Sequence, residues 1–308
     1  MNFEHLKTFY TVCQHQNFSK AAKAMYTSQP AVSRIISQIE AELGVELFFR
    51  GKDGVKLTKE GETFYKTIEL PFNQLVRLEK ELPASTKIFE GIIYLGATVT
   101  ALSCYLFDLI NDFSQKFPKV HYRIYTGSSS SIIEMVKNGK IDIAFITTPF
   151  PKSDELEVTN VKVIDNVLVG GKKYEDLSKK QTSINDLTNY PFILLSNEMQ
   201  FRAHINDFLN KYNVKINPEF EADSSSIIMP MVEKNYGLGF IPYEMAKESI
   251  ENRRAFLINL KERIPIRYVT MVTSSATNKA NIVLEISNYI RTKANNQKKK
   301  LENENWVK

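Results

Sequence analysis

Apolar and polar positions follow a helical period through residues 28–43. Apolar side chains recur three and four residues apart, which is the spacing of a helix that buries one stripe. Ser28 is a suitable N-cap, and Pro30 is tolerated in the first turn because an N–H there would have no helical partner. The pattern therefore predicts an amphipathic helix that begins after Ser28. Its apolar stripe comprises Val32, Ile35, Ile36, Ile39 and Leu43.

An Ala-rich segment precedes this helix, and a short hairpin with basic residues follows it. We predict a helix through residues 19–25 that Ser19 caps, with small side chains that allow a close helix crossing. This order predicts a winged helix-turn-helix domain over residues 1–58, whose second helix would meet base edges in the major groove. Gln can read adenine there, and Arg can bind guanine or a phosphate. Periodicity alone fits an ordinary helical hairpin equally well.

The segment from Leu6 to Tyr65 closely resembles the N-terminal domain of LysR-type transcriptional regulators. The landmarks of this resemblance are Ala21-Ala22, Ser28-Gln29-Pro30-Ala31, Ser33, Ile39-Glu40, Leu43-Gly44, Leu47-Phe48, Arg50, Leu57-Thr58 and Gly61. One departure lies in the wing, where Asp53 stands in place of a second Arg, so we expect Lys52 or Lys56 to replace that contact. The residues that we expect at the DNA interface are Ser28, Gln29, Pro30, Ser33, Arg34, Ser37, Arg50 and Lys52.

A second long apolar stripe follows the wing, on a helix that Thr58 can cap and that is predicted over residues 59–82. The stripe comprises Phe64, Ile68, Phe72 and Leu75. We expect it to pack against the same helix of a second subunit, which would give a homodimer or a homotetramer, and the family resemblance implies the same role. The alternative is a helix that packs on its own domain. Pro71 removes one helical hydrogen bond and predicts a bend or a break.

Beyond a predicted hinge at residues 83–91, β-rich and helical segments alternate up to residue 291. The order strand, helix, strand predicts parallel sheets with helices on both faces. Two similar α/β lobes are expected, one from residues 92–163 with 268–291 and one from residues 164–267, followed by a basic polar tail at 292–308. This half resembles the effector-binding domain of the same family, which has a periplasmic-binding-protein-like fold. Its landmarks are Gly96, Phe117-Pro118, Gly139, Asp142-Ile143-Ala144 and the run GLGFIP at 237–242.

Hydroxyl-bearing and amide residues follow several of the predicted strands. Ligands collect at the carboxyl ends of parallel strands, where helix N-termini present free N–H groups. Such residues suit a small anion or a polar metabolite, and Arg202 could neutralise a carboxylate. The alternative for each Ser or Thr is a helix cap or a loop. The candidate effector-binding residues are Thr98, Thr100, Ser128, Ser129, Thr147, Asn197, Arg202 and Ser225.

Composition narrows the class of protein further. The chain has 308 residues, 43% hydrophobic and 24% charged, which is ordinary for a globular protein of about two domains. Its net charge of +5 includes +4 from residues 291–308, so the DNA hypothesis depends on where charges lie. Cys13 and Cys104 form no CxxC pair and the four His are scattered, so we expect no metal site and no cofactor.

The sequence shows neither an apolar run long enough to cross a bilayer nor a leader-like start, so a cytoplasmic protein without a membrane partner is expected. No nucleophile motif or dinucleotide fingerprint is present, and no catalytic residue is assigned. The sequence therefore predicts a DNA-binding transcriptional regulator that a small-molecule effector controls from between two lobes. The alternative is an α/β enzyme or ligand-binding protein with an unrelated helical N-terminus.

Overall fold

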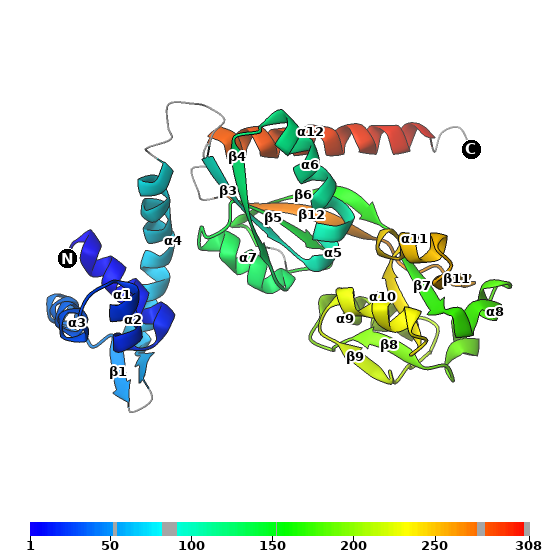
Figure 1. Ribbon diagram of the computed structural model, residues 1–308, viewed down its shortest axis with the longest axis horizontal. Helices are drawn as coiled ribbons and strands as arrows, with labels where there is room; N and C mark the ends of the chain where they lie inside the picture. The colour runs from blue at the N-terminus through cyan, green and yellow to red at the C-terminus, as the bar shows by residue number, and fades with distance from the viewer. Residues whose placement is uncertain (52–53, 82–90, 152, 276–280, 305–308) are drawn as a thin grey trace. The chain divides into compact units, whose positions relative to one another are not determined.

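The computed structural model describes residues 1–51, 54–81, 91–151, 153–275 and 281–304 (Figure 1). The chain divides into two compact units, an N-terminal one that comprises residues 1–84 with 138–140 and a larger one that comprises the rest of the chain. Residues 83–90 of the predicted hinge and Lys52 of the wing lie outside the described residues, whereas Gly91, the last residue of that hinge, already begins a strand. The hinge therefore stays a prediction.

The N-terminal unit contains three short helices, a two-stranded wing and a long helix. Asn2, Asn17 and Ser28 cap the three short helices, each accepting a hydrogen bond from a backbone N–H three residues on. The second helix begins at Phe18 because the cap is Asn17, and the prediction of Ser19 was wrong by two residues. The elements are α1 (Phe3–His15), α2 (Phe18–Ala24), α3 (Gln29–Leu43), β1 (Phe48–Gly51), β2 (Gly54–Leu57) and α4 (Lys59–Glu81).

Helix α4 begins as predicted, because the Thr58 hydroxyl accepts a hydrogen bond from Gly61 N at 2.9 Å. It continues through Pro71 as one helix, so of the predicted bend or break, the break into two helices does not occur. Its apolar stripe packs against α1 of the same unit, where Ile68 is 8% and Phe72 5% exposed. Three members of the stripe are thus covered, and only Leu75 is exposed. The ring pairs Phe9–Phe64, Phe3–Phe72 and Tyr10–Phe72 have centroid distances of 4.9, 5.5 and 4.6 Å.

This packing corrects the expectation that the whole stripe is free for a second subunit. Aromatic side chains of α1 cover Phe64 and Phe72 within the chain itself. The alternative, a helix that packs on its own domain, describes this part of α4.

The larger unit contains two five-stranded sheets, each with its own helices and core (Figure 1). The first sheet has the order β4-β3-β5-β12-β6 and the second the order β11-β7-β10-β8-β9. The first comprises β3 (Gly91–Ala97), β4 (Val120–Thr126), β5 (Ile143–Thr147), β6 (Leu156–Ile164) and β12 (Arg267–Ser274). The second comprises β7 (Asn166–Gly171), β8 (Phe192–Leu195), β9 (Phe220–Ala222), β10 (Leu238–Pro242) and β11 (Ala255–Ile258).

Neither sheet is fully parallel, which corrects the sequence prediction. Strands β3, β4 and β5 are parallel, as are β8, β9 and β10. Strand β12 is antiparallel to both β5 and β6, and β7 is antiparallel to β10 and β11. The chain passes from the first sheet to the second directly between β6 and β7, and it returns from β11 to β12.

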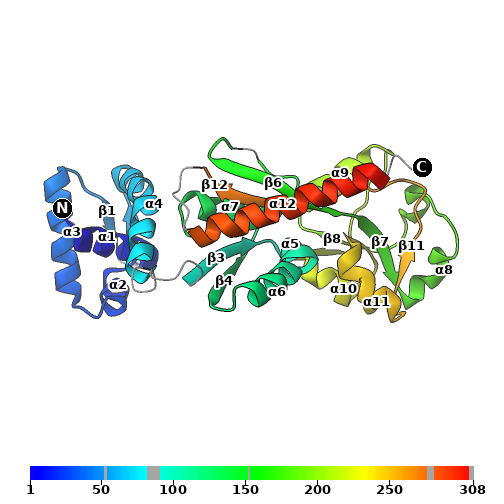
Figure 2. The ribbon, with the colours of Figure 1, turned by 90° about the horizontal axis from the view of Figure 1, so that it is seen from above.

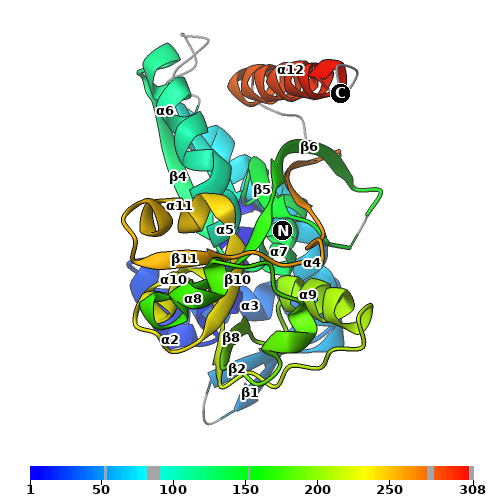
Figure 3. The same cartoon turned by 90° about the vertical axis from the view of Figure 1, so that its right-hand side faces the viewer.

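Helices cover both faces of each sheet. In the first lobe, α6 (Phe107–Lys116) and α12 (Asn281–Glu304) share one core, and α7 (Ser129–Lys137) packs into another (Figure 2). In the second lobe, α9 (Gln200–Asn210) lies on one side of the sheet, and α10 (Ser225–Glu233) and α11 (Tyr243–Glu251) lie on the other (Figure 3). Helix α12 continues to Glu304, so most of the predicted polar tail is helical.

The remaining elements are short. Helix α5 (Val99–Ala101) leads through the π-helical segment Leu102–Leu106 into α6, and the second lobe adds α8 (Glu175–Ser178) with the 3-10 turns Lys172–Tyr174 and Ile184–Leu187. The carboxyl ends of β3 and β5 and the N-termini of α5, α7 and α10 border one cavity.

Candidate functional site

The first candidate surface is the exposed side of α3 with the wing beside it. Ser28, Gln29, Pro30, Arg34 and Ser37 are exposed and Ser33 is half-buried, while the opposite face of α3 lies in the core. The apolar stripe thus leaves the polar side chains of α3 facing outward, as the sequence predicts. Tyr26, which the sequence analysis did not single out, is 99% exposed in the turn before α3.

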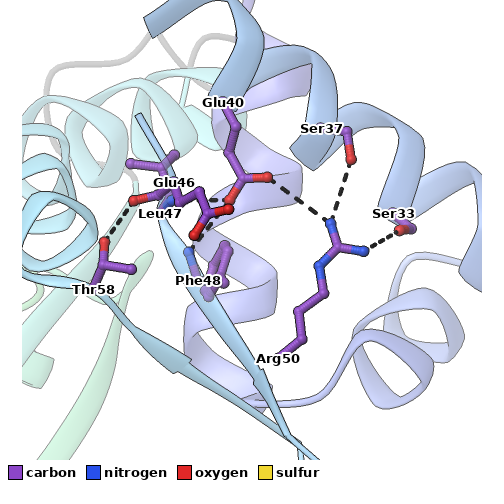
Figure 4. Close-up of polar contacts among 8 residues, drawn as sticks. All are labelled: Ser33, Ser37, Glu40, Glu46, Leu47, Phe48, Arg50 and Thr58. Carbon is purple, nitrogen blue, oxygen red and sulfur yellow. Dashed lines mark hydrogen bonds and ion pairs between the residues drawn. The ribbon is translucent and has the colours of Figure 1, made fainter. Parts of the chain in front are cut away.

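Arg50 connects the wing to α3 (Figure 4). Its guanidinium donates to Ser33 Oγ at 3.4 Å and to Ser37 Oγ at 3.3 Å. It also lies 5.3 Å from the centroid of the Phe18 ring, and Nη2 is 3.9 Å from Glu40 Oε2. The Arg50 side chain remains 52% exposed. Arg50 therefore holds its charge beside the hydroxyls of α3 and leaves part of it open to solvent.

Glu40 and Thr58 fix the position of the wing. Glu40 Oε1 accepts hydrogen bonds from Leu47 N at 2.8 Å and from Phe48 N at 3.3 Å, at the entry to β1. Thr58 Oγ1 donates to Glu46 O at 2.7 Å, and Thr58 N donates to Leu47 O at 3.0 Å. The start of β1 is thus tied both to α3 and to the first turn of α4.

The second candidate site is a cavity of about 350 Å³ between the two lobes of the larger unit. Six of the eight predicted effector residues line it: Thr98, Thr100, Ser128, Ser129, Thr147 and Ser225. Thr98 and Ser128 also accept hydrogen bonds from backbone N–H groups three residues on, so they cap helices and border the cavity at once. Across it, Thr100 Oγ1 and Ser225 Oγ are 3.2 Å apart, which joins the first lobe to the second.

Two predicted effector residues, Asn197 and Arg202, do not line this cavity. Asn197 is exposed. Arg202 is buried, and its guanidinium donates to Leu195 O at 2.7 Å and to Glu221 Oε1 at 2.8 Å. Its charge is therefore already neutralised within the second lobe, which removes the reason for assigning it to a ligand.

Arg267, which was not predicted from the sequence, also lines the cavity and is 2% exposed. Its guanidinium donates to Thr147 Oγ1 at 3.4 Å and to Asn166 Oδ1 at 3.1 Å, and Cζ lies 3.8 Å from the centroid of the Phe201 ring. Arg267 Nε is buried without a hydrogen-bond partner. Burial lowers the pKa of Arg267 to about 10, so the group stays charged at neutral pH.

Among the described residues, Arg267 has no acidic partner. Within the described part of the chain, no carboxylate lies within ion-pair distance of it. A buried charge is normally paired, because desolvation without compensation is costly. Glu198 and Asp223 border the same cavity but are exposed. The cavity therefore combines one buried cation, several hydroxyls and two carboxylates at exposed positions.

No helix in the described residues is long and apolar enough to cross a membrane. In the same residues, no three His, Cys, Asp or Glu side chains gather into a group that could hold a metal ion.

Two family models match the chain. The model described as bacterial regulatory helix-turn-helix protein, lysR family, matches residues 3–62, and the LysR substrate binding domain matches residues 89–294. The transcriptional regulator CysB of Burkholderia cenocepacia is 31% identical over 231 residues, which cover 75% of this chain and 74% of CysB. BbuR of Bordetella bronchiseptica is 24% identical over 286 residues, covering 92% of this chain and 87% of BbuR.

Solved structures share the fold over most of the chain. The LysR family regulator CbnR aligns with a TM-score of 0.73 at 18% identity and covers 96% of this chain and 99% of its own. CbnR complexed with its target DNA aligns with a TM-score of 0.72 at 18% identity, covering 96% of this chain and 100% of its own. The effector-binding domain of QuiR in complex with shikimate has a TM-score of 0.59 at 17% identity and covers 67% of this chain and 98% of its own.

Proposed function

The chain belongs to the LysR family of transcriptional regulators, and from this premise we propose that a small anion bound in the cavity controls its binding to DNA. The protein is a DNA-binding regulator with an effector-binding domain, and not an enzyme.

At the DNA interface we propose contacts from Gln29, Ser33, Arg34 and Arg50. These residues lie on the exposed side of α3 or in the wing beside it, with Arg50 in contact with α3 itself. Gln and Arg carry the paired donors and acceptors that read base edges, and Arg also binds phosphates. Ser28 and Pro30 lie at the start of the same helix and would approach the DNA backbone.

The observation that supports an anionic effector is the buried guanidinium of Arg267, which forms no ion pair with any described carboxylate. A ligand carboxylate or similar oxoanion in the cavity would accept hydrogen bonds from this group and neutralise its charge. The hydroxyls of Thr100, Ser129 and Ser225 would supply further hydrogen bonds. A ligand with a single anionic group is favoured, because the carboxylates of Glu198 and Asp223 border the same cavity.

An effector could control DNA binding because the cavity in which we propose that it binds lies between the two lobes. Thr100 and Ser225 come from different lobes and contact each other directly. A ligand that contacts both lobes would change the separation between them. It would do so by binding one arrangement of the lobes more tightly than the other, because a ligand shifts a conformational equilibrium only through such a difference in affinity. We propose that this shift reaches DNA through the arrangement of subunits in a homodimer or homotetramer, which would present paired wings to DNA.

A thermal-shift experiment tests the chemistry of the effector. Wild-type protein is heated with sodium acetate, benzoate, glycine or sulfate, and with acetamide and benzamide as neutral analogues, at constant ionic strength. We expect at least one monoanion to raise the melting temperature, with about 2.7 kcal/mol of stabilisation at 100 times its Kd. The same anion should change the affinity for operator DNA. Equal stabilisation by an anion and its amide would contradict the proposal.

A further inference from the structure

The carboxylate of Glu40 lies where the recognition helix, the wing and Arg50 meet (Figure 4). Its side chain is 16% exposed. One carboxylate oxygen accepts hydrogen bonds from Leu47 N and Phe48 N, and the other lies 3.9 Å from Arg50 Nη2. A single side chain thus sets both the path of β1 and the local field at the Arg50 guanidinium.

We infer that Glu40 is a positioning residue for DNA recognition, which holds the Arg50 guanidinium against Ser33 and Ser37 so that the three side chains act as one reading surface. This inference rests on the proposed DNA contacts of Arg50 and Ser33. Among the described residues, the Glu40 carboxylate forms hydrogen bonds or an ion pair only with Leu47 N, Phe48 N and Arg50, and Arg50 is the only one of these that we propose as a DNA contact.

The geometry of Arg50 supports the inference. An exposed Arg in a hairpin ordinarily samples many rotamers, and ordering it on binding has an entropic cost. Here the guanidinium is held by two serine hydroxyls, the face of the Phe18 ring and the Glu40 carboxylate. The planar fork of Arg suits several partners at once, which the compact ammonium of Lys does not. The donors of Arg50 are therefore oriented before DNA arrives.

Removal of the negative charge of Glu40 should affect binding to specific DNA and to random DNA differently. A carboxylate close to DNA repels phosphates, so removal of its charge should leave affinity for random DNA unchanged or slightly higher. If Glu40 orients Arg50, the same change should lower affinity for the specific site. A purely structural role would lower both affinities together.

Glu40→Gln separates these roles, because the Gln side-chain oxygen can still accept from Leu47 N and Phe48 N while the charge near Arg50 is lost. Glu46→Gln is the matched control. Glu46 carries the same charge in the turn after α3, is exposed, and its carboxylate makes no hydrogen bond or ion pair with any described residue. Arg50→Lys keeps the positive charge and removes the fork.

The experiment measures fluorescence anisotropy with two duplexes over a range of salt concentrations. One is the sequence that wild-type protein selects from a random pool, and the other is scrambled. We expect Glu40→Gln and Arg50→Lys each to lower the ratio of specific to random affinity about tenfold. The double variant should lose little more than either single one, because neighbouring groups in one network are not additive. Glu46→Gln should keep the wild-type ratio.

Several results would overturn the inference. They are an unchanged ratio in Glu40→Gln, equal loss on both duplexes with a lower melting temperature, or additive losses in the double variant. The variant Gln29→Ala distinguishes failure of the inference about Glu40 from failure of the proposed DNA-binding function. If Gln29→Ala lowers specific affinity while Glu40→Gln does not, the proposed DNA interface is supported and the positioning role of Glu40 is contradicted. If wild-type protein selects no sequence, the proposed function fails as well.

Discussion

Replacement of Arg267 by Met tests whether the cavity holds an uncompensated charge. A pKa of about 10 for a buried guanidinium corresponds to about 3 kcal/mol against the charged form, since each pKa unit corresponds to about 1.36 kcal/mol. The pKa is lower in the folded state than in the unfolded state, so at neutral pH, where both states are protonated, this cost is present in full. It is relieved only as pH rises above about 10.

Met removes that cost and also removes favourable contacts. The lost hydrogen bonds to Thr147 and Asn166 are worth about 1 kcal/mol each, and the contact with the Phe201 ring adds up to about 2 kcal/mol. These opposing amounts nearly cancel. We therefore expect Arg267→Met to change the free energy of unfolding without ligand by less than about 1.5 kcal/mol, while it abolishes stabilisation by anions.

The assay is urea denaturation followed by circular dichroism in chloride buffer at pH 7.5. Arg202→Met is the matched control, because Arg202 is similarly buried but donates to Glu221 and to the Leu195 carbonyl. Its loss should cost about 2–4 kcal/mol, since partners are left unpaired. If Arg267→Met without ligand costs more than about 3 kcal/mol, or still responds to anions, Arg267 is a structural residue and the assignment of the cavity is wrong.

Burial raises the pKa of Cys13 and Cys104 to about 12, so little thiolate forms at pH 7.5. Intact-mass spectrometry should therefore find both thiols unmodified after an hour with iodoacetamide. Labelling at the rate of a free thiol would contradict this. Leu75→Glu should weaken self-association in light scattering with a normal melting temperature, whereas Ile68→Glu should unfold the N-terminal unit because Ile68 lies in its core. If Leu75→Glu assembles like the wild type, this part of α4 is not an interface.

Helix ends and strand ends were predicted well where their structure depends on residues that are close in the sequence. Helix α3 follows Ser28 and ends at Gly44, whose φ of 71° suits glycine, and both features are local. The six hydroxyl residues of the cavity were also predictable, because strand ends and helix starts can be located from the pattern of apolar positions. The error at α2 was of the same local kind, since Asn17 is as good a cap as Ser19.

Sequence patterns gave wrong predictions where the packing or pairing of an element depends on a segment distant in the chain. The apolar stripe of α4 shows that one face is buried, but it does not show that α1 supplies the cover. Strands β6 and β7 form almost one continuous run, broken only at Asp165, and their antiparallel partners β12, β10 and β11 come much later in the chain. The sequence pattern therefore predicted parallel sheets and missed the antiparallel strands.

The same distinction explains why the wrong arginine was assigned to the effector. Arg202 follows a strand and lies in the first turn of a helix, which makes it a plausible anion ligand from sequence. Glu221 from the neighbouring strand, however, already neutralises its charge. Arg267 begins an apolar strand near the end of the effector domain, where an Arg looks like a surface residue. Folding places it against Phe201 and Thr147 with no described carboxylate near it. What identifies an anion site is a buried cation whose counter-charge is missing, and a missing partner becomes visible only when the chain is folded.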